Sequence, residues 1–70
     1  MKRRDLIKRI AGKAKEKQMN WEFVREGASH SLYQLGATRV VLPRHSEINE
    51  ITALSIMKDL EGQLGKGWWK

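Results

Sequence analysis

The sequence contains no cysteine, and this absence removes two ways of stabilising a chain of only 70 residues. Neither a disulfide nor a thiolate metal site can form, so the fold depends on the packing of helices and strands. No apolar run approaches the about 20 residues that a membrane helix needs, and the basic start Met1–Arg4 leads into no long apolar segment. We therefore expect one domain over residues 1–70, without a deep cofactor pocket and located in the reducing cytoplasm.

Acidic residues are also few. Asp and Glu number 8 against 14 Lys and Arg, which leaves a net charge of +6 on a very small surface. Such a charge raises the local concentration of polyanions, so nucleic acid is the first partner to consider. The alternative is that the charge serves solubility alone.

Apolar residues of the first segment recur at helical spacing and predict an amphipathic helix with a basic outer face. They are Leu6, Ile7, Ile10, Ala11 and Ala14. Asp5 is the only plausible capping residue at its start. A second helix is predicted from Ile51 to Leu64, where apolar residues again recur at steps of mostly three and four. Asn49 or Ser46 can cap its start, and Gly65 and Gly67 end it.

Between these helices the pattern changes to short stretches of aromatic and β-branched residues, which predict three antiparallel strands. Their expected bounds are Trp21–Glu26, Ser29–Leu35 and Thr38–Leu42. Pro43 ends the third strand because proline has no amide hydrogen for the ladder. The expected fold is therefore α+β, in the order α-β-β-β-α, with both helices on one face of a three-stranded antiparallel sheet. The tail residues Trp68 and Trp69 either fold onto the domain or anchor a partner protein.

Turns of two residues at Gly27-Ala28 and Gly36-Ala37 would determine the register of this sheet. Counting from them places Arg25 opposite His30, and His30 opposite Pro43. In that register Tyr33 lies on the face opposite to Trp21 and Phe23. Core packing is expected for all three rings, although at least one of them could stack on an unpaired base if its face is open. Arg25, His30, Arg44 and His45 then gather at one end of the sheet, close enough for Arg25 and His30 to contact one phosphate together. A bulge would change this register.

This group of residues suits metal-independent RNA cleavage. The reaction needs one group to deprotonate the ribose 2′-hydroxyl, one to protonate the leaving oxygen, and cations to stabilise the phosphorane. Histidine suits both proton transfers near neutral pH and arginine suits the last role, although a lone histidine in a strand is more often structural. Glu47 and Glu50 are better interpreted as helix-terminus residues than as an acid/base pair, and their spacing with His45 matches no known metal site.

At these residues the chain resembles the HicA family of toxins from toxin-antitoxin systems, over most of its length from Asp5 to Leu60. The family has a Leu-Ile helix, matched at Leu6-Ile7, and a Trp-x-φ-Val-Arg strand, matched by Trp21–Arg25. Its Gly-Ser-His motif is matched at Ser29 and His30, but the preceding glycine is Ala28 here. A frequent Pro-x-His step corresponds to Pro43 and His45.

The resemblance implies a double-stranded RNA-binding-domain-like fold, an endoribonuclease that cuts messenger RNA, and inhibition by a HicB-type antitoxin in a hetero-oligomer. It makes His30 the catalytic residue, with Arg25, Ser29, Arg44 and His45 in RNA-binding or supporting positions. No metal and no small-molecule cofactor is expected. The competing interpretation is a non-catalytic RNA-binding module. A DNA-binding regulator is less favoured because neither helix has a helix-turn-helix partner.

Overall fold

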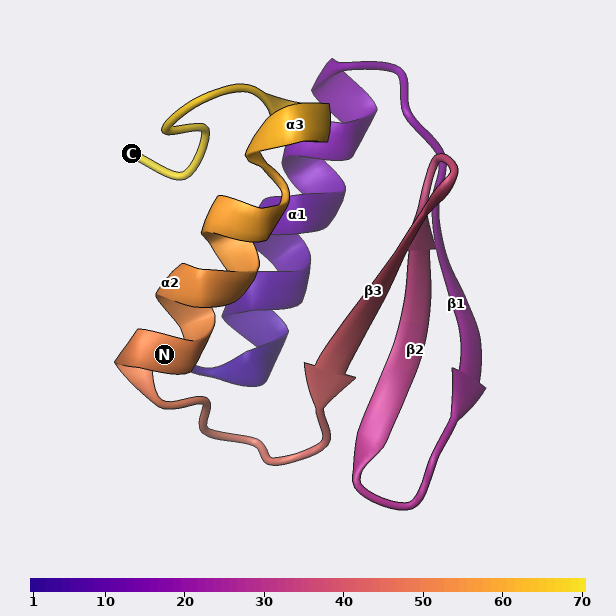
Figure 1. Cartoon of the computed structure of the whole chain (residues 1–70), viewed down its shortest axis with the longest axis vertical. Coiled ribbons are helices and arrows are strands. Elements are labelled where there is room, and N and C mark those ends of the chain that lie inside the picture. The colour runs from indigo at the N-terminus through magenta and orange to yellow at the C-terminus, as the bar shows by residue number, and fades with distance from the viewer.

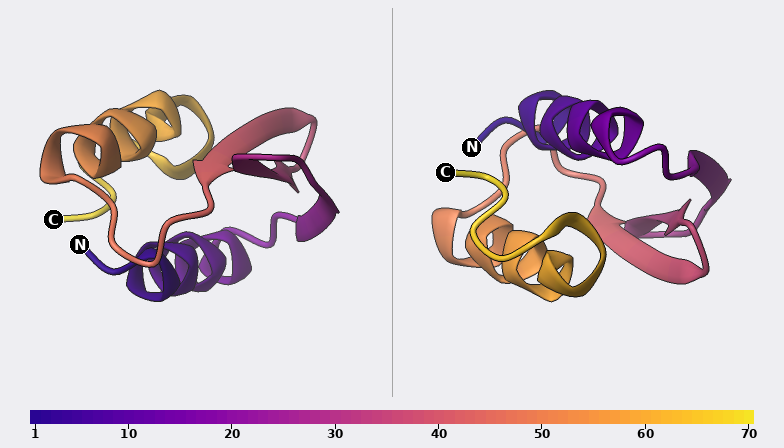
Figure 2. Two further views of the ribbon diagram at one scale, coloured as in Figure 1. Left: turned by 90° about the horizontal axis from the view of Figure 1, so that it is seen from below. Right: turned by 90° about the horizontal axis from the view of Figure 1, so that it is seen from above.

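The computed structural model describes all residues 1–70, and its elements follow the predicted α-β-β-β-α order with a short third helix at the end. Helices α1 and α2 lie side by side against one face of the sheet (Figures 1 and 2), which confirms the α+β fold with two layers. The three strands are antiparallel in the order β1-β2-β3. The elements are α1 (Arg3–Glu16), β1 (Trp21–Glu26), β2 (His30–Leu35), β3 (Thr38–Pro43), α2 (Glu50–Asp59) and α3 (Glu61–Leu64).

The core lies between the helices and the sheet. Helix α1 contributes three side chains spaced four residues apart, as the amphipathic pattern predicts. The strands add alternate residues from the same face of the sheet, because successive side chains in a strand point to opposite faces. The buried hydrophobic residues are Leu6, Ile10, Ala14, Leu35, Val40, Leu42, Ile48, Ala53, Met57, Leu60 and Leu64. We call the other side of the sheet, which no helix covers, the open face.

The start of α1 differs from the prediction. Lys2, not Asp5, is the N-cap residue, and it makes no side-chain capping hydrogen bond; Asp5 lies in the first turn. The Arg3 amide instead donates to the Ser46 carbonyl at 2.9 Å, and the Ile48 amide donates to the Met1 carbonyl at 2.8 Å. A backbone segment distant in sequence therefore satisfies one of the free amides in the first turn of α1.

The second predicted helix is divided in two. Asn49 caps α2 as expected, since its side chain accepts from the Ile51 amide at 2.8 Å. The helix then tightens at Leu60, whose amide bonds to the Met57 carbonyl at 3.2 Å, and α3 continues to Leu64 before Gly65. The break between the two helices keeps Leu60 and Leu64 in the core, where their exposed fractions are 2% and 1%. The tail folds onto the domain, where the Trp68 indole donates to the Met57 carbonyl at 2.8 Å.

The second hairpin has the predicted register. Leu35 pairs with Thr38, and Tyr33 with Val40, across a two-residue turn at Gly36-Ala37. Gly36 has a φ of 58°, a backbone conformation that glycine adopts without steric cost. At the far end of the same ladder His30 pairs with Pro43, also as predicted.

The first hairpin does not have the predicted register. Glu26 pairs with Ser31 and Arg25 with Leu32, so the prediction that Arg25 faces His30 is wrong. The connection comprises residues 27–30, closed by a hydrogen bond of 2.7 Å from the Gly27 amide to the His30 carbonyl. A bulge lies between Phe23 and Arg25, where Val24 has no partner on β2. We call residues 27–30 the His30 loop.

This bulge also corrects the prediction for Tyr33. Phe23 pairs directly with Tyr33, so Trp21, Phe23 and Tyr33 share the face that the helices cover. The Trp21 and Tyr33 rings stack with centroids 4.7 Å apart, and Phe23 meets Tyr33 edge-on at 5.5 Å. The prediction that Tyr33 lies on the face opposite to Trp21 and Phe23 is therefore wrong. Phe23, 51% exposed, is the most accessible of these three rings.

Candidate functional site

His30 is the first residue of β2 and lies on the open face, because its neighbour Ser31 is fully buried on the helix side. Its side chain is exposed, and the imidazole makes no hydrogen bond or ion pair with the rest of the chain. Pro43 lies opposite it and presents no amide hydrogen on that strand. The two ring nitrogens are therefore free to bind a ligand or exchange a proton with it.

Arg44 binds the loop that carries His30. Its Nη1 donates to the carbonyl oxygens of Gly27 at 3.0 Å and Ala28 at 3.4 Å, and its amide donates to the Ser29 carbonyl at 3.1 Å. Its Nε lies 2.6 Å from Oε2 of Glu26. Hydrogen bonds between charged partners are stronger than neutral ones, so Arg44 limits the conformations of the His30 loop.

A second arginine binds the same end of the sheet from the helix layer. Arg3 Nε donates to the Pro43 carbonyl at 2.9 Å, and its Nη2 donates to the Ser31 hydroxyl at 2.7 Å. That hydroxyl donates in turn to Oε1 of Glu26 at 2.5 Å. The chain Arg3–Ser31–Glu26–Arg44 therefore links α1, both strands of the first hairpin and the segment after β3.

Three members of this network, Arg3, Glu26 and Ser31, are not predicted from the sequence. Arg3 is one of several basic residues at the start of the sequence, and the pairing of Glu26 with Ser31 depends on the longer turn at residues 27–30. The only available signal was the alternation in β2, which places the polar Ser31 in line with the apolar Tyr33 and Leu35. A polar residue on a buried strand face needs a partner, but the pattern does not say which one.

A pocket of about 280 Å³ adjoins this network, and we call it the cationic pocket. It lies between the start of α1 and the loop that joins β3 to α2, at the lower end of the molecule in Figure 1. No acidic and no hydrophobic side chain lines it. The lining residues are Lys2, Arg3, Arg4, Arg44 and Ser46. Arg44 therefore belongs both to the pocket and to the contacts that hold the His30 loop.

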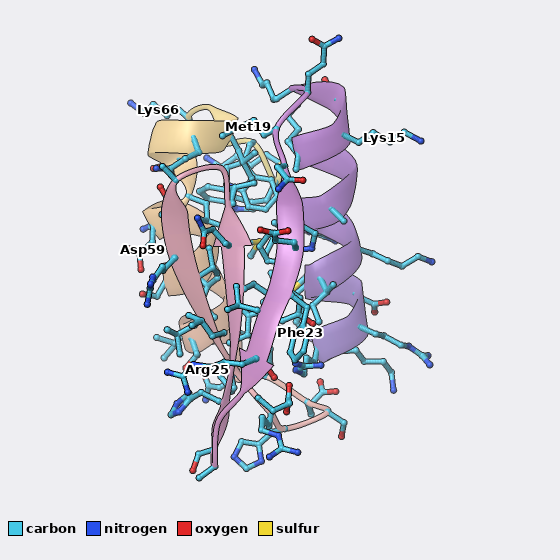
Figure 3. The ribbon with its side chains drawn as sticks, turned by 90° about the vertical axis from the view of Figure 1, so that its right-hand side faces the viewer. Lys15, Met19, Phe23, Arg25, Asp59 and Lys66 are labelled. Atoms are coloured by element: carbon cyan, nitrogen blue, oxygen red, sulfur yellow. The ribbon has the colours of Figure 1, made fainter.

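Three other predicted site residues lie near His30 without side-chain bonds of their own. Ser29 and His45 are exposed; Ser29 precedes His30, and His45 follows Arg44 in the loop after β3. Arg25 shares the open face with His30, as predicted, but pairs with Leu32, two positions along β2. Figure 3 looks onto this face, with α1 beside β1 and α2 behind the other strands, and Arg25 on the lower half of β1. Diagonal neighbours of this kind are about 7–8 Å apart, so direct pairing of Arg25 with His30 is absent.

Glu47 and Glu50 have a role that the sequence did not indicate. Glu50 lies in the first turn of α2, as expected, but it also accepts from the Met1 ammonium at 2.8 Å, and Glu47 does so at 3.2 Å. These hydrogen bonds, chiefly the one to Glu50, raise the pKa of the Met1 amino group. The same hydrogen bond, and then the positive charge of that amine, lower the pKa of Glu50.

No group of three or more His, Asp or Glu side chains is arranged to hold a metal ion, and no helix has the length and apolar composition to cross a membrane. Comparison of the chain with protein-family models, with curated proteins and with solved structures finds no match.

Proposed function

We propose that this chain is an endoribonuclease of the HicA type, the toxin of a toxin-antitoxin system that cleaves messenger RNA with His30 as general acid or base. The observation that carries the proposal is an exposed imidazole without a protein partner, on a loop that Arg44 links to a pocket lined by cations. RNA binding requires cations for the phosphates, and cleavage requires a group that transfers protons near neutral pH.

The proposed reaction breaks a phosphodiester bond by attack of the ribose 2′-oxygen on phosphorus, with release of the 5′-oxygen. His30 either takes the 2′-hydroxyl proton or gives a proton to the leaving oxygen, and His45 is the candidate for the other transfer. Arg44 uses Nε and Nη1 within the protein, which leaves Nη2 to donate to the charged phosphorane. The exposed Ser29 hydroxyl, beside His30, is a further donor to the phosphate.

The proposal includes a partner and a location. A HicB-type antitoxin would inhibit the toxin in a hetero-oligomer by covering His30, which the exposure of that side chain allows. The toxin would act in the cytoplasm, where messenger RNA is translated. The role needs no metal and no small-molecule cofactor, because the side chains present can transfer the protons.

The test is His30→Ala, assayed by cleavage of an end-labelled transcript in the presence of chelator. General acid/base groups contribute about 10²–10⁴-fold in rate, and we expect a loss of that size. Because His30 is exposed, the variant should keep the fold, which amide NMR spectra of variant and parent would verify. A folded His30→Ala that cleaves at the parent rate would refute the assignment.

His45 is tested separately through the pH dependence of cleavage. If the two histidines transfer the two protons, the parent has a bell-shaped profile and His45→Ala loses one limb of it. An unchanged profile in His45→Ala would remove His45 from the mechanism and leave His30 without its proposed partner.

A non-catalytic RNA-binding module is the second candidate, and one observation favours it: no histidine lines the cationic pocket. A protein that only binds RNA would use these cations without His30. It would show salt-dependent binding and no cleavage products at any pH. The transcript assay in chelator therefore separates the two functions.

A further inference from the structure

The cationic pocket and His30 lie on opposite sides of the same end of the sheet. His30 is on the open face, whereas Arg3 reaches the pocket from the helix layer, where it binds the buried Ser31 hydroxyl. Between them runs the His30 loop, hydrogen-bonded to Arg44. A ligand that contacts both places must therefore pass around the end of the sheet.

The positive charge of the pocket is only partly neutralised within the protein. Glu26 pairs with Arg44 and contacts Arg3 only through the Ser31 hydroxyl, while the side chains of Lys2 and Arg4 make no hydrogen bond or ion pair. Arg3 keeps Nη1 free in addition. Like charges held this close repel one another, so an anion in the pocket is favoured electrostatically.

Shape and lining restrict the kind of anion. The volume of about 280 Å³ is just below the range of about 300–1,000 Å³ that small-molecule pockets occupy. No aromatic or aliphatic side chain lines it, so a base has nothing to stack on. A phosphate group, bound by arginine and lysine, matches these donors best.

We infer that the cationic pocket binds a backbone phosphate of the RNA next to the one that is cleaved at His30, so that the strand turns around the end of the sheet. This inference rests on the proposed function for the identity of the ligand. It also specifies the substrate class: the RNA is single-stranded, because a stiff duplex cannot follow so tight a turn, whereas a flexible strand can.

The experiment measures binding of a fluorescein-labelled, single-stranded octamer of 2′-O-methyl RNA, which cannot be cleaved. The pocket variant is Lys2→Gln with Arg4→Gln, two exposed side chains without partners. The control is Lys15→Gln with Lys66→Gln, which removes the same charge at the other end of the molecule (Figure 3). For single strands the plot of log K against log salt has a negative slope. Its steepness decreases by about 0.7 for each phosphate that the protein no longer neutralises.

We expect the pocket variant to make the salt dependence less steep by about 0.7 or more, and the control to leave its steepness nearly unchanged. In the parent, addition of the octamer should shift the NMR signals of the Arg3 guanidinium group, which lines the pocket and has no role at His30. This measurement needs no variant and decides the matter if the pocket variant unfolds. Equal slopes in both variants, or unmoved Arg3 signals, would overturn the inference.

Two further outcomes distinguish this inference from the proposed function. If the octamer binds in the pocket but the parent cleaves no transcript, the catalytic proposal fails and the phosphate site stands. If the parent cleaves RNA and the two variants behave alike, cleavage stands and the pocket is not part of the substrate path. Tighter binding of a blunt duplex than of the single strand would refute the single-stranded substrate class.

Discussion

Gly27 is the residue at which the His30 loop leaves little space for a side chain. A Cβ added there would lie 3.0 Å from the His30 carbonyl oxygen, the atom that closes the loop through the Gly27 amide. This distance is tighter than nine in ten real Cβ contacts, so the backbone at His30 would have to move by a few tenths of an ångström.

From this geometry we predict that Gly27→Ala destabilises the protein by about 1–3 kcal/mol, the usual cost of an overpacked site. It should also shift the amide NMR signals of His30 and Arg44 and lower the rate of transcript cleavage. Ala28→Gly is the matched control, because Ala28 is exposed and has no such contact. Urea denaturation measures both. Equal stability of Gly27→Ala and the parent would show that the loop tolerates the methyl group.

Ser31 shows why part of the site could not be predicted residue by residue. Its hydroxyl is fully buried and binds Arg3 on one side and Glu26 on the other. Arg3 lies 28 residues away in sequence, and no local pattern connects the two. His30, Ser29, Arg44 and His45 could be proposed from motif and residue type, but the partners that position the loop could not.

At the scale of the element, the bulge at Val24 determines which side chains meet in the first hairpin. Without the bulge, the short turn predicted from Gly27-Ala28 puts Tyr33 on the face opposite to Trp21 and Phe23. With it, Phe23 and Tyr33 pair, and the Trp21 ring stacks on Tyr33. Arg25 stays on the open face because the longer turn moves its partner by two positions, which preserves the side of the sheet.

Deletion of Val24 is therefore predicted to be tolerated, since this residue has no partner on β2 and its removal leaves the other pairs in register. We expect a loss of about 1 kcal/mol, typical of a single change. Deletion of Glu22 is the control. It turns the partly buried Trp21 to the open face and should cost more than the loss of Val24, about 2 kcal/mol, because the Trp21 ring leaves its contacts with Tyr33 and the core.

Urea denaturation and NOEs between the Trp21 and Tyr33 rings measure the outcome of these deletions. The NOEs should persist without Val24 and vanish without Glu22. If the two deletions were equally damaging, the bulge would not be the element that sets this register.

At the scale of the whole molecule, the chain start is joined to the segment before α2. The Met1 ammonium bonds to Glu47 and Glu50, and the backbone of residues 1–3 bonds to that of residues 46–48. The cationic pocket lies at this junction, so its shape depends on the contact between α1 and the loop after β3. Neither segment forms the pocket alone.

This junction should give stability a defined pH dependence when the Met1 amine is free. The pKa of Glu50 is lowered from 4.5, so its contribution is present above that pH and is lost as the pH falls through the lower folded value. The pKa of the Met1 amine is raised from 8.0, so its contribution is present below that pH and is lost as the pH rises through the higher folded value.

We accordingly expect Glu50→Gln to lower Tm most between these two pH values, and to approach the parent on either side of them. Thermal denaturation from acid to alkaline pH measures the difference. Glu22→Gln, an exposed carboxylate without an ion pair, is the control. A Tm difference that does not vary with pH would show that the amine and Glu50 do not interact in solution.

The sequence by itself determined the order of the elements, the buried face of the first helix and the register of the second hairpin, whereas two apolar residues of the predicted second helix, Ile51 and Leu54, are exposed. These features follow from periodicity and from a two-residue turn, which depend on neighbours in the chain. It also pointed to His30 through the Ser29-His30 and Pro43–His45 motifs. All of these inferences use residues close together in sequence.

Only the tertiary structure decided the bulge at Val24, the face of Tyr33, the division of the last helix and the pocket beside the His30 loop. Each depends on packing between segments that are distant in sequence, such as the bond from Arg3 to the Pro43 carbonyl across 40 residues. Periodicity says which side of an element is buried, but not what it is buried against. The free energy that selects those partners comes from contacts that form only when the helices meet the sheet.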